Sequence, residues 1–369
     1  MAGEASGDLH GASLIKAMKE KDSEVSFYGI GGDKMKSAGM HLSFHTNQMA
    51  FLGFVEVIKH LPFIRKVQRE LLQVVERLKI KTAVLIDYPG FNLNFAAKLK
   101  KLGVKIIYYI SPQIWAWGEG RIKKIKKLVD KMLVILPFEE EFYKKNGIEA
   151  EFVGHPLIEQ IEEYKFPGKD EFFEKYHLEK RKKILLILPG SRLQEVEKIF
   201  PEVIKAAEVI CNEFDMQIVV GAAPGINADL FYELSASKNF KVIKDETYEL
   251  MKFAELGIVK SGTSTLEAAL MGLPFIIVYK TSFLTYLIGR NLISLKNIGL
   301  VNIVAGETVV PELIQDEVNP RKIVEMGRDY LLNQEKIKSV KQKLEVIKGK
   351  LGSKKASMNA ASIIYSFVK

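Results

Sequence analysis

Short apolar runs alternate with amphipathic stretches along almost the whole chain, and this alternation limits the fold more than any other feature of the sequence. The apolar runs of the first half are 25–30, 82–87, 104–110 and 131–136. Those of the second half are 183–192, 216–224, 256–262 and 274–280. Continuous apolar runs of this length are typical of parallel strands that are buried on both faces. Two such series predict an α/β fold with two Rossmann-like, doubly wound domains.

The composition agrees with two domains and restricts the choice of partner. A chain of 369 residues is too long for one ordinary core, and no apolar run approaches the roughly 18 residues of a membrane span. The single Cys211 favours a reducing, cytoplasmic location, and no signal peptide precedes the first motif. The formal charge of +9 indicates an anionic partner, for which nucleic acid, an acidic lipid surface and a phosphorylated substrate are the candidates.

The chain opens on a turn of small residues, MAGEASGD, that carries Glu4, Ser6 and Asp8. Its glycines allow close approach of the backbone to a ligand, and a helix that starts at Asp8 would present free N–H groups to an anion or a sugar. In a doubly wound domain such a turn follows the first, central strand, which is missing here. We therefore expect that the numbered chain starts late and that an apolar run precedes Met1.

Asp87 lies at the carboxyl end of the run 82–87, which is where ligands bind in open α/β sheets. A carboxylate at this position can accept a proton from a sugar hydroxyl as a general base. It can equally cap the helix that follows, and its position alone leaves both roles open.

Two further motifs place polar residues at the start of a helix. Ser191 and Arg192, in LPGSRLQEVEKIFP at 188–201, follow a predicted strand and open a helix; Ser191 is a natural N-cap and Arg192 can bind a diphosphate through two hydrogen bonds. In KSGTSTLEAALMGLP, at 260–274, the helix start can receive a pyrophosphate, and Glu267 can accept ribose hydroxyls. Each motif alone is equally typical of a capped helix, but both in one domain favour a nucleotide-diphosphate site.

The stretch 49–71 combines a wide apolar set with the cations Lys59, Arg65, Lys66 and Arg69. An ordinary core helix would explain the apolar residues, but the basic flanks favour a surface that contacts an anionic bilayer or acyl chains. The predicted membrane and acyl-chain residues are Leu52, Phe54, Val55, Val57, Ile58, Leu61 and Phe63.

Ten motifs, in order, resemble those of the lipid-A-disaccharide synthase family of inverting glycosyltransferases. They are GEASGD, GIGG…M…AG, LGFVEV, IDYPGFN, SPQIWAW, LPFE…FY, FVGHPL, LPGSR…EV, SGTSTLEAALMGLPFIIVYK and PELIQ. The resemblance extends from Gly3 to about Gln315, and the missing first strand is the one plain departure.

The resemblance implies a GT-B fold, in which two Rossmann-like domains face a cleft. It implies an acceptor domain at 1–168, a UDP-sugar domain at 169–345 and a helix at 346–369 that packs back on the first domain. The polar stretch 164–183, interrupted by Pro167 and Gly168, would be the linker.

The implied reaction joins UDP-2,3-diacylglucosamine to 2,3-diacylglucosamine 1-phosphate (lipid X) in a β(1→6) linkage and releases UDP. The resemblance further implies no metal, no cofactor and a peripheral location on the anionic cytoplasmic face of the inner membrane, while homodimerisation stays open. Asp87 and Glu4 would be catalytic. The residues expected to bind substrate are Ser6, Gly7, Asp8, Ser191, Arg192, Glu195, Thr263, Ser264, Thr265, Glu267, Asn302 and Gln315.

Three alternatives remain at this stage. The nearest is another UDP-N-acetylglucosamine enzyme of the same fold, either a 2-epimerase or the transferase that forms lipid II. An epimerase would not need the apolar patch at 49–64. A membrane protein that binds nucleotide sugar without chemistry is the second alternative, and a nucleic-acid binder, suggested only by the net charge, has no supporting motif.

Overall fold

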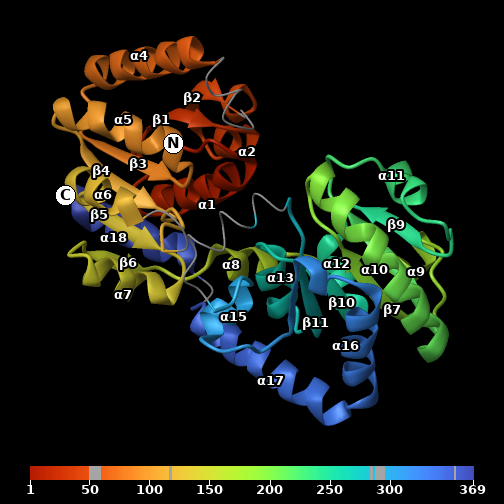
Figure 1. The fold of residues 1–369 in the computed structure, drawn as a ribbon. Coiled ribbons are helices and arrows are strands. Elements are labelled where there is room, and N and C mark those ends of the chain that lie inside the picture. The colour runs from red at the N-terminus through yellow and green to blue at the C-terminus, as the bar shows by residue number, and fades with distance from the viewer. Residues whose placement is uncertain (50–59, 116–118, 283–285, 287–295, 353–354) are drawn as a thin grey trace. The chain divides into compact units, whose positions relative to one another are not determined.

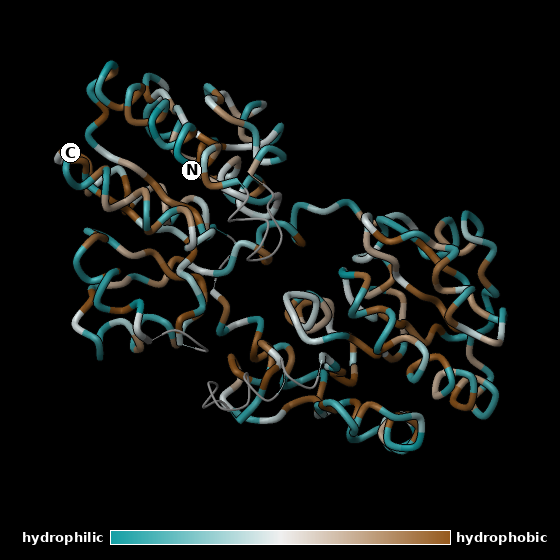
Figure 2. Tube along the Cα trace, turned by 45° about the horizontal axis from the view of Figure 1, so that its top comes forward, coloured by the Kyte–Doolittle hydropathy of each residue, from teal (hydrophilic) through white to brown (hydrophobic). Residues whose placement is uncertain are grey.

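The computed structural model describes residues 1–369 except 50–59, 116–118, 283–285, 287–295 and 353–354 (Figure 1). The described residues form two compact units, one made of Met1–Glu159 and Leu351–Lys369, the other of Gln160–Lys350. In Figure 2 the apolar stretches follow the strands inside each unit, while polar residues lie along the outer helices.

The first unit contains six described strands, all in parallel pairs. They are β1 (Phe27–Gly31), β2 (Met40–His45), β3 (Thr82–Ile86), β4 (Lys105–Tyr109), β5 (Lys131–Val134) and β6 (Ala150–Phe152). β1 pairs with β2, and β3 to β6 form a second sheet in sequence order. Within the described residues, the chain start links the two sheets: Ala2 forms a parallel bridge with Ile86 and donates a hydrogen bond to the Ile30 carbonyl, 3.0 Å away.

Helices lie on both faces of the β3–β6 sheet. The helices of the first unit are α1 (Ala5–Lys21), α2 (Asp33–Ser37), α4 (Leu61–Arg77), α5 (Pro89–Lys101), α6 (Ile122–Leu128), α7 (Pro137–Lys145) and α18 (Ala356–Val368), with short 3₁₀ turns at Thr46–Gln48 and Glu119–Arg121; α8 (Pro156–Glu163) begins in this unit. Alternate residues of β4 serve different cores: Ile106 and Tyr108 pack with α4, α5 and α6, whereas Ile107 and Tyr109 pack with α1 and α18. The C-terminal helix α18 lies along α1 in the first unit.

The second unit is built on one parallel sheet with the order β12–β11–β10–β7–β8–β9. Its strands are β7 (Lys183–Leu188), β8 (Met216–Ala222), β9 (Lys241–Lys244), β10 (Ala254–Lys260), β11 (Phe275–Tyr279) and β12 (Glu312–Ile314). Its helices are α9 (Lys169–Lys175), α10 (Leu193–Phe214), α11 (Ala228–Glu233), α12 (Thr247–Phe253), α13 (Ser264–Leu270), α15 (Leu300–Ala305), α16 (Pro320–Leu332) and α17 (Gln334–Lys350), with a 3₁₀ turn at Gln315–Glu317. α10 packs against α16 and over β7 and β8, and α13 packs against β10.

The polar stretch 164–183 belongs to the second unit and is not the linker that its sequence indicates. The Tyr164 hydroxyl donates to a carboxylate oxygen of Glu249 at 2.5 Å, and the Lys252 ammonium lies 3.8 Å from the centre of the Phe166 ring. These aromatic contacts hold the segment on α12. The boundary between the units therefore falls inside α8, after Glu159, rather than after Gly168.

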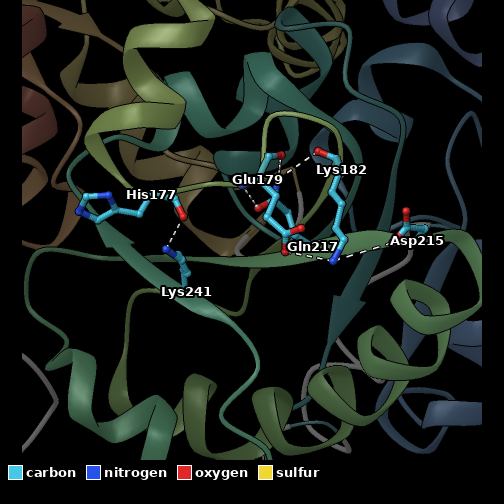
Figure 3. Close-up of polar contacts among 6 residues, drawn as sticks. All are labelled: His177, Glu179, Lys182, Asp215, Gln217 and Lys241. Atoms are coloured by element: carbon cyan, nitrogen blue, oxygen red, sulfur yellow. Dashed lines mark hydrogen bonds and ion pairs between the residues drawn. The ribbon is translucent and has the colours of Figure 1, made fainter.

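The loop that leads into β7 is fastened to the neighbouring strands by polar side chains (Figure 3). Gln217 of β8 accepts a hydrogen bond from the Glu179 N–H and donates to the carbonyls of Glu179 and Lys182. The Lys241 ammonium of β9 donates to the His177 carbonyl at 2.5 Å. A segment that is polar by composition is thus ordered because partners far away in the sequence bind its backbone.

Candidate active site

Asp87 lies where β3 ends and α5 begins, in a backbone conformation that few residues adopt. Asp87 and Tyr88 have φ angles of 44° and 47°, both in the left-handed region that costs a non-glycine residue about 1–3 kcal/mol. Two donors stabilise the turn: the Tyr108 hydroxyl lies 2.6 Å and the Asn92 side-chain nitrogen 2.7 Å from the Asp87 carbonyl oxygen. Pro89 then starts α5. The strained turn is therefore fixed from β4 and from α5.

The Asp87 carboxyl group is half-buried, and its electrostatic surroundings suit a general base. Burial raises its pKa to about 6, the negative charge of Glu4 adds to this rise, and a hydrogen bond from the Tyr88 N–H opposes it. A carboxylate with this pKa is ionised at neutral pH but retains more basicity than an ordinary aspartate. The charge of Glu4 thus acts on the predicted base, although the two residues are far apart in sequence.

The loop that carries Glu4 is packed tightly against the Asp87 turn. A Cβ atom on Gly3 would lie 2.3 Å from the Tyr88 ring, so only glycine fits this position without movement of Tyr88. Glu4 is the exposed N-cap residue of α1, which begins at Ala5 rather than at the predicted Asp8. Ser6 is exposed, whereas Gly7 is buried against Ala2.

Asp8 has a structural role that its sequence motif does not reveal. Its side chain is buried, and its carboxylate accepts hydrogen bonds from the N–H groups of Gly32, Lys34 and Met35 at 2.7, 3.1 and 3.0 Å. Asp8 therefore caps the start of α2 and fixes the glycine-rich turn of the GIGG motif, at residues 29–32, that leads into it. This use of both carboxylate oxygens sets Asp8 apart from the exposed Glu4 and Ser6 of the same loop.

Glu139 orders the neighbouring edge of the sheet, and we did not single it out from the sequence. The residue is only 1% exposed, and its carboxylate accepts from the Ser111 hydroxyl at 2.7 Å, the Trp115 indole N–H at 2.9 Å and the Leu136 N–H at 3.0 Å. Burial raises the pKa of Glu139, and the three donors oppose that rise. A glutamate at the third position of a helix that starts with proline was the available signal, because it is typical of a capping interaction.

Replacing Glu139 with alanine is expected to destabilise the first unit by about 3 kcal/mol, because three donors, two of them buried and one partly buried, lose their acceptor at about 1–3 kcal/mol each. Glu139→Gln keeps one oxygen acceptor and should lose less. Denaturant unfolding monitored by tryptophan fluorescence measures both effects. Equal stability of the alanine variant and the unchanged chain would contradict the assigned role of Glu139.

Most of the predicted acyl-chain surface lies outside the described residues: Leu52, Phe54, Val55, Val57 and Ile58 belong to 50–59. Of the remainder, Leu61 is 39% exposed at the start of α4, and Phe63 is partly buried, with its ring edge-to-face with Phe44 at 6.2 Å. Phe63 thus contributes to the core, and Leu61 stays on the surface.

In the second unit, the turn after β7 carries exposed Ser191 and Arg192. The N-cap of α10 is Arg192 and not the predicted Ser191, whose backbone N–H instead donates to the Glu195 carboxylate at 3.2 Å. Glu195 also pairs with Lys260, at the end of β10, at 2.7 Å. Although burial alone would raise the pKa of Glu195, the pairing with Lys260 and the Ser191 N–H hold it below its usual value. Glu195 therefore connects two strand ends and supports the turn that presents Arg192.

The second helix start in this unit follows β10 directly. Thr263 is exposed at the N-cap of α13, whereas Thr265 is fully buried and donates to the Gly262 carbonyl at 2.8 Å. Burial raises the pKa of Glu267, and hydrogen bonds from Ser264 and Tyr248 oppose the rise. Because β7 and β10 are adjacent parallel strands, this turn and the Arg192 turn lie at the same edge of the sheet.

The side chains of Asn302 and Gln315 form hydrogen bonds within the second unit. Asn302 is fully buried; its side chain donates to the Val310 carbonyl and the Glu312 carboxylate and accepts from the N–H groups of Val309 and Val310. The Gln315 side chain accepts from the Thr281 N–H at 2.8 Å and donates to the Thr281 carbonyl at 3.3 Å. Both residues hold β12 in place, and their distant backbone partners could not be seen in the sequence.

Across the part of the chain that the structure describes, no group of three or more His, Cys, Asp and Glu side chains is arranged to hold a metal ion. Among the helices of the same residues, none combines the length and the apolar character that crossing a bilayer requires.

Comparison with solved structures supports the fold. A UDP-N-acetylglucosamine 2-epimerase from Neisseria meningitidis bound to UDP-GlcNAc has a TM-score of 0.67 and 13% identity, covering 98% of this chain and 97% of that chain. The S. aureus MnaA–UDP co-structure has a TM-score of 0.69 and 13% identity, covering 100% of this chain and 95% of that chain. The predicted α/β, GT-B fold class is confirmed.

Comparison of sequences identifies the family. The family model described as lipid-A-disaccharide synthetase matches residues 1–366. The lipid-A-disaccharide synthase of Syntrophus aciditrophicus (strain SB) is 41% identical and covers 100% of this chain and 97% of its own length, and that of Geobacter sulfurreducens is 41% identical, with 99% and 95% covered. Since the match spans both the Asp87 turn and the Arg192 turn, the chain belongs to the lipid-A-disaccharide synthase family of glycosyltransferases.

Proposed function

We propose that this enzyme joins UDP-2,3-diacylglucosamine to 2,3-diacylglucosamine 1-phosphate in a β(1→6) linkage and releases UDP, without a metal or cofactor. The observation that carries the proposal is the Asp87 carboxylate, half-buried at the end of β3 with its pKa raised to about 6, in a chain of this family. Burial and a nearby like charge both raise the pKa of a carboxyl group towards neutral pH, where a general base is most effective.

The proposed step moves one proton and exchanges one bond at the anomeric carbon. Asp87 takes the proton of the acceptor 6-hydroxyl while that oxygen attacks the anomeric carbon of the donor sugar from the face opposite the diphosphate. The bond between the anomeric carbon and the diphosphate oxygen breaks, and UDP carries away the electron pair. The configuration inverts, which gives a β linkage from an α-linked donor.

The turns after β7 and β10 are proposed to bind the departing UDP. The exposed Arg192 guanidinium can bind the diphosphate through two hydrogen bonds, and the exposed Thr263 stands at the neighbouring helix start. Glu267, held by Ser264 and Tyr248, is suited to accept the ribose hydroxyls. Positive charge and N–H groups together stabilise the negative charge that develops on the leaving group.

We propose that the enzyme binds its acylated substrates at the anionic cytoplasmic face of the inner membrane and that α4 faces the lipid there. Leu61 is exposed at the start of this helix, and Arg65, Lys66 and Arg69 are exposed along it. A polybasic surface gains about 1 kcal/mol per Lys or Arg near anionic lipid.

Replacing Arg65 and Arg69 together with alanine is expected to weaken binding to anionic vesicles about 30-fold, the effect of about 2 kcal/mol. Vesicle sedimentation at low salt measures it. The matched control replaces Lys123 and Lys127 of α6, which are also exposed. An equal loss in both double variants would mean that net charge alone, and not α4, attracts the membrane.

Incubation with UDP-2,3-diacylglucosamine and lipid X, followed by mass detection of the disaccharide, tests the reaction itself. Formation of disaccharide and UDP supports the proposal. Turnover of UDP-N-acetylglucosamine without lipid X would instead identify an epimerase.

A further inference from the structure

Lys260 lies at the end of β10 and forms an ion pair with the turn that presents Arg192. Its ammonium Nζ is 2.7 Å from Oε1 of Glu195, in the first turn of α10. The side chains of Lys260 and Glu195 are only 20% and 16% exposed. Water screens such a pair less than it screens a pair on the surface, so the attraction is stronger. The pair thus fastens the turn after β7 to the end of β10.

The ammonium of Lys260 is also held from the next strand of the sheet. It lies 5.7 Å from the centre of the Tyr279 ring, at the end of β11, which is within the range of a cation–π interaction. The strands β11, β10 and β7 are consecutive in the sheet. Lys260 therefore contacts residues next to both neighbouring strand ends, and these contacts limit the conformations of its long side chain.

The second carboxylate oxygen of Glu195 binds the turn itself. Oε2 accepts a hydrogen bond from the Ser191 N–H at 3.2 Å. A Cβ atom on Gly190 would lie 2.6 Å from this oxygen, and the φ angle of Gly190 is 129°, a value that favours glycine. The backbone of the turn thus leaves room for the Glu195 side chain, which uses one oxygen for the turn and the other for Lys260.

The negative charge of Glu195 conflicts with the binding of an anion at the same turn. Burial opposes the ionisation of Glu195, but Lys260, the Ser191 N–H and the charge of Arg192 together lower its pKa, so it is charged at neutral pH. Because the charges of Glu195 and Arg192 interact, an unpaired Glu195 carboxylate would attract the Arg192 guanidinium. It would also repel a diphosphate bound there.

We propose that Lys260 is a positioning residue for the diphosphate of UDP: it pairs with Glu195 and so leaves the Arg192 guanidinium available to the ligand. With Lys260 present, the three side chains carry one net positive charge, and without it they carry none. This inference rests on the proposed function of the Arg192 turn and adds to it a residue that acts through Glu195.

Direct binding of the diphosphate by Lys260 is the alternative. The structure favours the indirect role, because the Lys260 ammonium is mostly shielded from solvent and already contacts Glu195 and Tyr279. Arg192, in contrast, is exposed. The two roles predict different results when the charge of Glu195 is removed, because only the indirect role requires that charge.

The first test compares the affinities for UDP and for uridine, measured by NMR titration on the full chain. Lys260→Met removes the charge but keeps an unbranched side chain, and it should weaken UDP binding about tenfold, the scale of a lost hydrogen bond to a charged group. Uridine, which has no phosphate, should bind as before. Lys260→Arg keeps the cation and should retain UDP affinity to within about threefold.

The second test removes the charge of Glu195. Glu195→Gln keeps an oxygen that can accept from the Ser191 N–H, and it should bind UDP at least as tightly as the unchanged chain. The double variant with Lys260→Met and Glu195→Gln should recover the UDP affinity of the unchanged chain to within about threefold, because the two residues act as a pair.

The matched control breaks another ion pair between the same strands. Lys183, at the start of β7, pairs with Glu255 near the start of β10 at 2.8 Å, so this pair lies at the opposite edge of the sheet. Lys183→Met should therefore leave UDP binding unchanged. An equal loss in the Lys183 and Lys260 variants would overturn the inference.

Four further results would contradict the role of Lys260. Unchanged UDP affinity in Lys260→Met is the first, and an equal loss of uridine affinity is the second. A loss that persists in the double variant is the third, because Lys260 would then bind the diphosphate directly. The fourth is weaker UDP binding by Glu195→Gln, which decides the question even if Lys260→Met does not fold. Absence of UDP binding by the unchanged chain would instead overturn the proposed UDP site, and this inference with it.

Discussion

Replacing Asp87 with alanine is expected to lower the turnover of sugar transfer by about 10²–10⁴, the contribution of a general base. UDP affinity should stay unchanged, because the turns proposed to bind UDP belong to the second unit and Asp87 to the first. Steady-state kinetics and titration calorimetry with UDP measure the two quantities separately. Turnover within a factor of about two of the unchanged enzyme would remove Asp87 from the catalytic role.

The same residue sets the expected pH dependence. Since the pKa of Asp87 is raised to about 6, kcat/KM should fall as the pH drops through 6 and the base becomes protonated. Glu4→Gln removes a negative charge that raises this pKa, so the acidic limb should move to lower pH. The control is Glu20→Gln, an exposed change at the other end of α1, which should leave the limb in place. An identical pH profile for the Glu4 and Glu20 variants would show that the charge of Glu4 does not affect the pKa of Asp87.

Replacing Arg192 with alanine is the second change with a large expected effect, a loss of about 10²–10³ in kcat/KM. Removal of one donor to a developing negative charge typically has this effect, and here that charge lies on the departing diphosphate. Arg192→Lys should recover only part of the loss, because an ammonium cannot form the paired hydrogen bonds of a guanidinium.

The control for this prediction lies on the same helix. Lys205 is exposed on α10, several turns beyond Arg192, and Lys205→Ala should leave kcat/KM unchanged. UDP binding measured on the Arg192 variant distinguishes weaker ground-state binding from loss in the transition state. A loss of equal size in both variants would point to the overall charge of the unit rather than to the Arg192 turn.

Much of the fold was accessible from the sequence, because its signals are local. Continuous apolar runs predicted β1, β3, β4, β5, β7, β8, β10 and β11, since parallel strands are buried on both faces. The edge strands β2, β6, β9 and β12 were missed. β6 and β12 have only three residues, too few to show a period, and β2 and β9 are only partly buried and form no continuous apolar run. The stretch 164–183 was assigned to a linker because its order depends on Glu249, Gln217 and Lys241, far away in the sequence.

The candidate site likewise contains residues that the sequence predicts and residues whose roles only the structure shows. The exposed Glu4, Arg192 and Thr263 and the half-buried Asp87 follow from motifs at strand ends, which fix where a residue lies in a doubly wound sheet. Whether a polar side chain remains available for a ligand depends on its partners, which no motif encodes. Asp8 caps α2, and Asn302 binds the backbone around Val310. For Glu139, the sequence position indicates only the local capping contact with the Leu136 N–H, whereas the contacts with Ser111 and Trp115 depend on the tertiary structure.

The sequence by itself determined the family, the α/β class and the strand ends at which chemistry can occur, because apolar periodicity and turn residues act over a few positions. Only the tertiary structure decided which carboxylate and amide side chains form hydrogen bonds within the fold and are therefore not available to a ligand. It also decided that the charge of Glu4 raises the pKa of Asp87. These properties arise from burial and from contacts between segments that are distant in the sequence. Such contacts exist only in the folded protein, so local sequence patterns do not reveal them.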